Sequence, residues 1–290
     1  MSIVLKKMNN QLLPTDLIKT VQYALAEDIG TGDITVQLIA SNTQAEAQVI
    51  SREQAILCGT AWFDEVFKQL DSQVQILWHV KDGETINPNQ ILCDLKGTAH
   101  ALLTGERTAL NFLQLLSGTA TKVQPYIKAI SSTHARILDT RKTLPGLRHA
   151  QKYAVRCGGA TNHRMGLYDA FLIKENHIIA AGSIKQATTA ARHHAAHLPI
   201  EVEVETLEQI KEALAAGADS LLLDNFTLSQ LREAVTLVQS QVKLEASGGV
   251  TTETIRAIAE TGVDFISVGE ITKNVQAVDL SMRMHTKDNY

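Results

Sequence analysis

Residues 200–224, IEVEVETLEQIKEALAAGADSLLLD, contain the pattern that decides the fold. The apolar segments IEVEVE and SLLLDN read as strands, and residues 206–216 between them have helical spacing. Thr206 and Gln209 form a capping-box signature at the start of this predicted helix, and Gly217 stands where a helix C-cap belongs. A strand, a helix and a second strand in succession favour parallel strands with the helix outside the sheet.

The same alternation covers the whole second half of the chain. Strands are predicted at ARILDT, AFLIKE, IEVEVE, SLLLDN, KLEASG and DFISVG, and helices near residues 145–157, 183–196, 206–216, 228–239 and 251–261. Such repeated units predict a parallel sheet of the α/β class, and six strands suggest a TIM-like barrel that is incomplete. A doubly wound open sheet is the structural alternative, but no G-x-G-x-x-G motif supports it.

The first part of the chain has a different pattern. A helix is predicted from Pro14 to Ala26 and another from Trp62 to Leu70, and strands are predicted at AEAQVISRE, AILCG, QVQILWHV and QILCDLKG. These short strands, separated by turn signals, indicate a small α+β domain with a mostly antiparallel sheet.

We therefore predict two domains. Residues 1–115 form an N-terminal α/β sandwich domain, to which the C-terminal residues 275–290 are a candidate addition, and residues 116–274 form an α/β barrel. A helix predicted from Thr104 to Ile130 connects the two. Arg107 falls in the first turn of that predicted helix, where the helix dipole disfavours a cation, and this mismatch invites an anionic partner.

The composition is that of an ordinary soluble globular protein, with 44% hydrophobic and 20% charged residues. No apolar run approaches the about 18 residues that span a bilayer, and the N-terminus MSIVLKKMNNQLLPTD lacks the features of a secretion signal. Cys58, Cys93 and Cys157 include no C-x-x-C pair, which argues against a disulfide framework or a zinc site and for a cytoplasmic location. A pI of about 6.2 disfavours nucleic acid as a partner.

Residues 136–177 reverse the sign of the protein's charge. They contain eight Arg and Lys residues against three acidic ones, in a chain whose formal net charge is -4. A local reversal of this kind favours a concentrated anionic ligand.

Every predicted strand of the second half ends in a polar, charged or glycine residue. These residues are Arg141, Lys142, Lys174, Glu203, Glu205, Asp224, Ser247, Gly248, Gly249 and Gly269. Because the carboxyl ends of the strands in an α/β barrel form the functional face, we expect one shared pocket there.

Two further patterns suggest what that pocket binds. Glu201, Glu203 and Glu205 alternate with valines and are expected to share the inward face. Glu203 and Asp224 could hold Mg²⁺ through hard oxygen ligands, or could belong to a salt-bridge network with nearby cations. The loops ASGG and SVGE follow the last two predicted strands, where such barrels often hold a phosphate.

The chain also resembles a known family. The segments GERTALNFLQLLSGTAT, DTRKTLPGLRHAQKYAVRCGGATNHRMGLYDAFLIKENH, EVEVETLEQ, LLLDNF, EASGGV and ISVGEIT look like quinolinate phosphoribosyltransferase, in one consistent order over about residues 14–285. The resemblance implies transfer of phosphoribosyl from 5-phosphoribosyl 1-pyrophosphate to quinolinate with decarboxylation, giving nicotinate mononucleotide, pyrophosphate and CO₂ in NAD biosynthesis. It also implies a cytoplasmic homodimer with shared active sites. Whether such dimers assemble further into hexamers stays open.

The resemblance assigns roles to residues at matching positions. Quinolinate is expected to bind Arg107, Thr140, Arg141, His163, Arg164 and Lys174, with Arg107 supplied by the partner subunit. Lys142, Glu203 and Asp224 are the expected catalytic residues, with Mg²⁺ as cofactor at the last two, partly through substrate or water. The phosphates are expected at Lys142, Ser247, Gly248, Gly249, Val268, Gly269 and Glu270.

Other functions remain open at this point. The nearest are a nicotinate salvage enzyme and a molybdate-transport-associated phosphoribosyltransferase of the same fold, and a third is a non-catalytic sugar-phosphate sensor. The histidines at 193, 194 and 197 are expected at a solvated helix end and have no assigned role.

Overall fold

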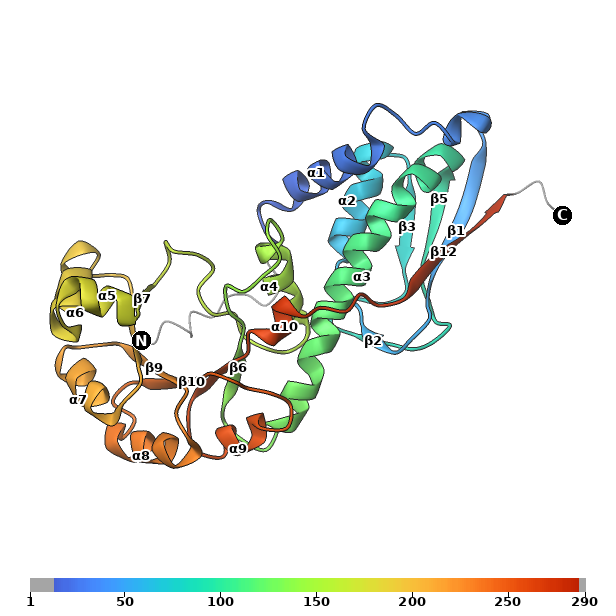
Figure 1. Cartoon of the computed structure of the whole chain (residues 1–290). Helices are drawn as coiled ribbons and strands as arrows, with labels where there is room; N and C mark the ends of the chain where they lie inside the picture. The colour runs from blue at the N-terminus through green and yellow to red at the C-terminus, as the bar shows by residue number, and fades with distance from the viewer. Residues whose placement is uncertain (1–12, 287–290) are drawn as a thin grey trace. The chain divides into compact units, whose positions relative to one another are not determined.

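The computed structural model describes residues 13–286, and the first part of the N-terminal stretch considered above as a secretion signal lies outside them. Within this range the chain forms two compact units (Figure 1). The barrel unit comprises residues 124–142 and 160–271, and the sandwich unit comprises residues 13–123, 143–159 and 272–286. No helix of the described residues is long and apolar enough to cross a membrane.

The barrel unit is built on one parallel sheet of six strands. Its order is β6-β11-β10-β9-β8-β7, with β6 (Arg136–Leu138), β7 (Phe171–Ile173), β8 (Ile200–Val204), β9 (Ser220–Asp224), β10 (Lys243–Ser247) and β11 (Phe265–Ser267). All six strands were predicted, and the α/β assignment is confirmed. Within the described residues β6 and β7 stay unpaired with each other at the two ends of the order, so the barrel is incomplete, as expected.

Helices follow the strands of the barrel unit in sequence. They are α5 (Glu175–Ala181), α6 (Ile184–His194), α7 (Leu207–Ala215), α8 (Leu228–Val238), α9 (Ile255–Ala259) and α10 (Glu270–Lys273), and Figure 1 shows α6, α7 and α8 along the outer side of the curved sheet. The capping boxes predicted at Thr206 and Thr227 are both present. The helix predicted at residues 251–261 is longer than the observed α9, and α5 was not predicted.

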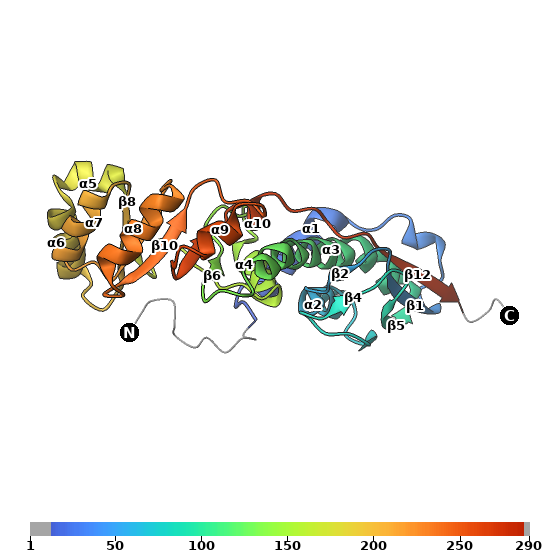
Figure 2. The ribbon, with the colours of Figure 1, turned by 90° about the horizontal axis from the view of Figure 1, so that it is seen from below.

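The sandwich unit is built on an antiparallel sheet in the order β12-β1-β5-β3, with a short second pair, β2 and β4. The strands are β1 (Gln44–Ser51), β2 (Ala55–Ile56), β3 (Gln75–Trp78), β4 (Thr85–Ile86), β5 (Ile91–Thr98) and β12 (Leu280–Thr286). Three helices, α1 (Leu17–Ile29), α2 (Thr60–Leu70) and α3 (Ala99–Ala129), lie to one side of this sheet, and a 3₁₀ turn, η2 (Val36–Leu38), and α4 (Arg148–Cys157) complete the unit (Figures 1 and 2). The predicted sandwich architecture is confirmed.

Large aromatic side chains fill the core of the sandwich unit. Trp62, Phe63 and Phe67 of α2 are almost fully buried, and the ring of Phe63 contacts those of Phe67 and Trp78 at centroid distances of 5.1 and 5.2 Å. Burial of such side chains supplies much of the hydrophobic stabilisation of a unit this small.

Helix α3 begins earlier than the sequence indicated. It starts at Ala99, directly after β5, so Arg107 lies in its third turn. The argument that the helix dipole disfavours Arg107 is therefore wrong, because the dipole acts within the first turn. The predicted domain boundary at residue 115 falls inside α3, and that division stays a prediction.

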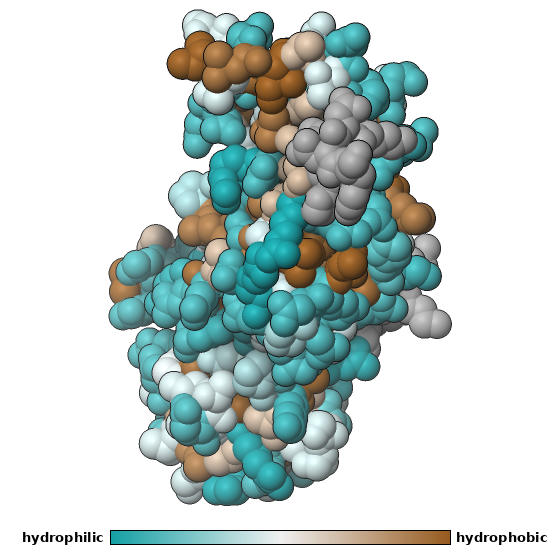
Figure 3. Space-filling model, turned by 90° about the vertical axis from the view of Figure 1, so that its right-hand side faces the viewer, coloured by the Kyte–Doolittle hydropathy of each residue, from teal (hydrophilic) through white to brown (hydrophobic). Residues whose placement is uncertain are grey.

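Apolar side chains are also exposed on the sandwich unit. Ile34 and Leu38, around η2, are 86% and 85% exposed, and Tyr23 of α1 is 76% exposed. Figure 3 shows apolar surface as separate patches on a mostly hydrophilic face.

Candidate active site

The strand ends of the barrel unit bring the predicted site residues to one edge of the sheet. Asp224 ends β9 and pairs in register with Ser247, which ends β10. Lys174 directly follows β7, and residues 139–142 and 268–270 follow β6 and β11. All the predicted site residues except Arg107 lie in the barrel unit.

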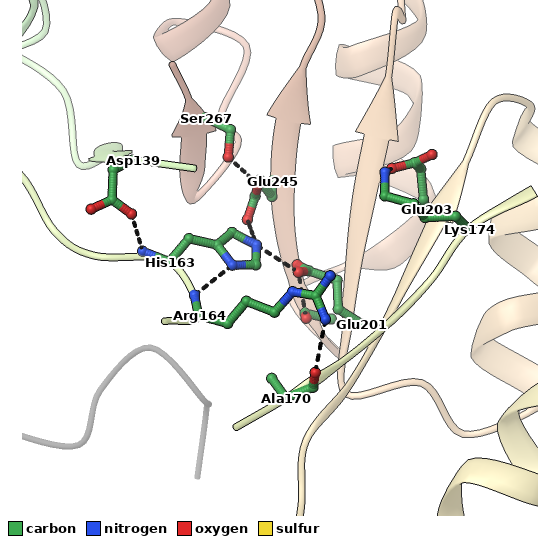
Figure 4. A network of polar contacts seen from close by, with 10 residues as sticks. Asp139, His163, Arg164, Ala170, Lys174, Glu201, Glu203, Glu245 and Ser267 are labelled. Atoms are coloured by element: carbon green, nitrogen blue, oxygen red, sulfur yellow. Dashed lines mark hydrogen bonds and ion pairs between the residues drawn. The ribbon is translucent and has the colours of Figure 1, made fainter. Parts of the chain in front are cut away.

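Glu203 lies near the end of β8 and forms an ion pair with Lys174, which comes from the neighbouring strand end (Figure 4). Glu201, two residues earlier, is buried, whereas Glu205 lies beyond the strand and is exposed. The prediction of three inward carboxylates is therefore wrong for Glu205, because β8 ends at Val204. Asp224 accepts a hydrogen bond of 2.8 Å from the side-chain amide of Asn225.

His163 lies between two buried carboxyl groups (Figure 4). Its Nε2 is 2.9 Å from Glu201 Oε2 and 3.4 Å from Glu245 Oε2. Ser220 donates to Glu201 at 3.1 Å, and Ser267 donates to Glu245. The network therefore connects strands β8, β9, β10 and β11 beneath the strand ends.

Glu245 is fully enclosed in this network. Burial raises its pKa to about 8, with a further contribution from the nearby charge of Glu201. A carboxyl group with this pKa is mostly protonated at neutral pH, so it adds no full negative charge to the interior.

The backbone around His163 is also held by hydrogen bonds. The N–H of Arg164 donates to His163 Nδ1 at 2.6 Å, so the ring carries its proton on Nε2, facing the carboxyl groups. The N–H of His163 and the side chain of Asn162 both donate to the buried carboxylate of Asp139, at 2.8 and 2.6 Å. These contacts fix the segment that presents Arg164.

Two guanidinium groups lie near each other at this edge. Burial and the charge of Arg141 lower the pKa of Arg164. Arg164 Nη1 donates to the carbonyl oxygen of Ala170 at 3.1 Å, which fixes the direction of the side chain. Two neighbouring cations of this kind are suited to a ligand with carboxylate groups, which arginine binds bidentately.

The glycine loop after β10 is tightly packed. Gly248 has a φ of +101°, and a Cβ there would overlap the side chain of Asn225. Helix α9 begins only at Ile255, so the loop's own backbone, rather than a helix N-terminus, faces any phosphate bound there. A Cβ at Gly269 would approach the Lys142 side chain to 3.1 Å, which places that lysine beside the second glycine loop.

Comparison with known proteins decides the family. The family profile "Quinolinate phosphoribosyl transferase, C-terminal domain" matches residues 119–283, and its N-terminal counterpart matches residues 33–117. The chain belongs to the quinolinate phosphoribosyltransferase family. The resemblance drawn from the sequence motifs is thereby confirmed.

Individual relatives agree with this assignment over nearly the whole chain. A probable nicotinate-nucleotide pyrophosphorylase [carboxylating] of Bacillus subtilis is 45% identical over 92% of both chains. The solved nicotinate-nucleotide pyrophosphorylase of Francisella tularensis is 48% identical, covers 98% of this chain and 99% of its own, and superposes with a TM-score of 0.91. Human nicotinic acid phosphoribosyltransferase is only 14% identical, with a TM-score of 0.59, and shares the fold alone.

Several residues of this quinolinate phosphoribosyltransferase site were not singled out from the sequence. They are Asp139, Asn225, Glu245 and Ser267. Glu245 had a usable signal, because a glutamate in the middle of the predicted strand KLEAS must find a partner when that strand is buried. Asn225 had none, since its φ of +55° and its contact with Gly248 depend on the fold.

Arg107 is the one predicted site residue of this family member that lies in the sandwich unit. It is exposed on α3. Its role toward quinolinate stays a prediction.

Proposed function

We propose that this enzyme transfers phosphoribosyl from 5-phosphoribosyl 1-pyrophosphate to quinolinate and removes one carboxyl group as CO₂. The products are nicotinate mononucleotide and pyrophosphate, as in de novo NAD biosynthesis. The observation that carries the proposal is the sheet edge, where the Arg141–Arg164 pair lies on the same strand-end face as Glu203, Asp224 and the glycine loop. Membership of the family supports it.

Quinolinate would bind at the part of this edge where the cationic side chains lie. Arg141 and Arg164 would each bind a carboxylate of the dianion, and Lys174 would add a third positive charge. His163, whose ring nitrogens contact Glu201, Glu245 and the Arg164 backbone, would mainly fix the segment that presents Arg164. Thr140 accepts the N–H of Lys142 at 3.0 Å and so fixes the lysine beside the substrate.

The bond to ribose forms when the quinolinate nitrogen attacks the anomeric carbon and pyrophosphate departs. The ribose passes through a state with oxocarbenium character, which a carboxylate such as Glu203 or Asp224 stabilises. Lys142 would neutralise the departing pyrophosphate, and Ser247, Gly248 and Gly249, with residues 268–270, would hold the 5′-phosphate. Positioning and electrostatics therefore suffice, and no protein nucleophile is needed.

Loss of CO₂ follows from the product of that step. Once the ring nitrogen carries ribose it is cationic, and it accepts the electron pair released when the C–C bond at C2 breaks. A proton then takes the place of the carboxyl group. One of the two arginines must lose its carboxylate partner at this stage. The other arginine still binds the remaining carboxylate and so keeps the product in place.

Magnesium is part of the proposal. Glu203 and Asp224 lie on adjacent strands at the same edge and offer the hard oxygen ligands that Mg²⁺ prefers. Because Lys174 already pairs with Glu203, the ion would also depend on oxygens of the substrate or of water. When bound, Mg²⁺ would offset the charge of the pyrophosphate group.

We also propose that the enzyme works as a homodimer, in which Arg107 of one subunit completes the site of the other. The exposed position of Arg107 on α3 and the exposed apolar residues Tyr23, Ile34 and Leu38 support a protein partner at the sandwich unit. Assembly of dimers into hexamers stays open.

The decisive test is release of labelled CO₂ from carboxyl-labelled quinolinate, with and without 5-phosphoribosyl 1-pyrophosphate and Mg²⁺. Release that needs both compounds is the expected result. If pyrophosphate forms from nicotinate instead, the enzyme is a salvage phosphoribosyltransferase. Binding of 5-phosphoribosyl 1-pyrophosphate without turnover of either acid would favour a sensor or a transport-associated relative.

The proposed location is the cytoplasm, where both soluble substrates are available. Nucleic acid and membrane are not proposed as partners, given the pI of about 6.2 and the polar strand-end site.

A further inference from the structure

Two cysteines far apart in sequence meet inside the sandwich unit. Cys58 follows β2 and is fully buried, and Cys157 ends α4 and is partly exposed. Their sulfur atoms and a carboxylate oxygen of Asp82 all lie within 4.8 Å of one another. The third cysteine, Cys93, is buried separately in β5.

A rigid framework holds this cysteine pair. Asp82 accepts hydrogen bonds from the N–H groups of Gly59 and Thr60, at 3.1 and 3.2 Å, and from the hydroxyl of Tyr153 at 2.9 Å. The N–H of Cys58 donates to Ser117 Oγ at 2.9 Å. The start of α2, the loop at Asp82 and α4 are thus tied together around the two sulfurs.

The two thiols have different surroundings, since Cys58 is buried and Cys157 is partly exposed. The neighbouring Cys58 thiol lowers the pKa of Cys157, and Tyr153 and Arg156 act in the same direction, whereas burial and the Asp82 carboxylate partly oppose them. Burial raises the pKa of Cys58 well above its ordinary value. Since the thiolate is the nucleophile, Cys157 is suited to react first with an oxidant and Cys58 to react second.

A metal ion fits the same cluster less well. Both oxygens of Asp82 already accept hydrogen bonds from the backbone or from Tyr153. Structural zinc sites use four Cys or His ligands, and the cluster contains only two such residues among those the structure describes.

We propose that Cys58 and Cys157 form a reversible intramolecular disulfide when the protein meets a hydroperoxide. The Cys157 thiolate attacks the peroxide oxygen, which gives a sulfenic acid and releases water or an alcohol. The sulfur of Cys58 then displaces the hydroxyl group, its proton leaves with that group as water, and the S–S bond forms. The two thiols together lose two electrons, and these reduce the O–O bond.

The disulfide would change the stability of the sandwich unit. It closes a covalent loop that contains β3, β5 and the whole of α3, and closing a long loop lowers the entropy of the unfolded chain. Cys157 also lies six positions before His163 in sequence. The bond would therefore fix the start of the segment that leads to His163 and Arg164, two residues predicted to bind quinolinate.

The experiment treats the full chain with hydrogen peroxide and then counts free thiols. Two of the three thiols should disappear, the mass should fall by two hydrogen atoms, and a non-reducing peptide map should join the peptides of Cys58 and Cys157. Dithiothreitol should restore all three thiols. The urea midpoint of the oxidised protein should be higher than that of the reduced protein.

Matched variants make the result specific. Cys93→Ser should still form the disulfide, whereas Cys58→Ser should stop at a sulfenic acid on Cys157 that a dimedone probe captures. The first variant keeps the pair intact, so the test does not depend on whether the second variant folds well.

Three results would overturn the proposal. They are equal oxidation of Cys93, a disulfide between two molecules in place of the internal one, and stoichiometric zinc in the purified protein that protects both thiols. The last result would assign the cluster to a metal instead.

Discussion

Glu245 shows how a single buried residue can make stability depend on pH. Its pKa is about 8 in the folded protein and near the ordinary value of 4.5 in the unfolded chain. Between these pH values the folded state holds a proton that the unfolded state has lost. The contribution of Glu245 to the free energy of unfolding is therefore fully present at low pH and is lost as the pH rises toward 8.

We expect Glu245→Gln to remove this dependence. Between pH 5 and pH 8 the free energy of unfolding of the wild type should fall by on the order of 3 kcal/mol more than that of the variant. Urea unfolding at several pH values measures this difference. The control is Glu208→Gln, which replaces an exposed carboxylate on α7. Parallel curves for wild type and Glu245→Gln would contradict the prediction.

Arg164 is predicted to bind a carboxylate of quinolinate. Arg164→Ala should raise the KM for quinolinate at least about tenfold, because a charge-assisted bidentate contact is lost. Arg164→Lys should recover only part of the loss, since an ammonium group cannot form the bidentate contact. Steady-state kinetics measure both effects. Arg256→Ala, on the exposed face of α9, should leave the KM unchanged.

At the scale of elements, the sequence could predict the strands and helices that local patterns determine. The strands of the barrel unit are short segments that are mostly buried within the sheet, such as IEVEV and SLLLD, and the capping boxes of α7 and α8 are local as well. Helix α5 was missed because its seven residues follow β7 with only Lys174 between them. Strand β12 was not predicted as a strand because its pairing with β1 depends on residues far away in sequence. The contact between Cys58 and Cys157 was hidden for the same reason.

The loop between β10 and α9 gives a prediction at this scale. Gly248→Ala should displace Asn225, which donates to Asp224, and should raise the KM for 5-phosphoribosyl 1-pyrophosphate by about tenfold or more. The control is Gly217→Ala, at a positive φ of +80° with open space around it, which should lower stability without changing either KM. An unchanged KM in Gly248→Ala would remove the glycine loop from the phosphate site.

Helix α7 offers a test of local stability that is independent of function. Thr206 accepts the N–H of Gln209 at 3.2 Å, and Thr206→Ala should lower the free energy of unfolding by about 1 kcal/mol. Thr206→Ser should retain most of the stability that Thr206→Ala loses. Urea unfolding gives the values, and a Ser variant as unstable as the Ala variant would show that the hydroxyl is not the cause.

At the scale of the whole molecule, the predicted site residues are divided between the two units. Arg107 lies in the sandwich unit, and all the others lie in the barrel unit. The sequence could predict the architecture of each unit, but it could not show how Arg107 meets a substrate, because that depends on assembly.

Complementation tests the shared site. Arg107→Ala and Asp224→Ala should each be nearly inactive as homodimers. When the two are mixed under conditions that exchange subunits, up to about a quarter of wild-type activity should return, since half the dimers are mixed and each mixed dimer has one intact site. No recovery in confirmed mixed dimers would mean that each site uses the Arg107 of its own subunit.

The position of β12 has a consequence for protein synthesis. The residues of the six-stranded sheet, 136–267, leave the ribosome before residues 280–286, which form the outer strand beside β1. The antiparallel sheet begins with β1, which precedes the six-stranded sheet in the chain, and is completed by β12, which follows it. Until then β1 has an open edge to which another nascent chain can add a strand. A chain truncated before Leu280 would therefore expose the edge of β1 and should be less soluble than the chain that contains β12.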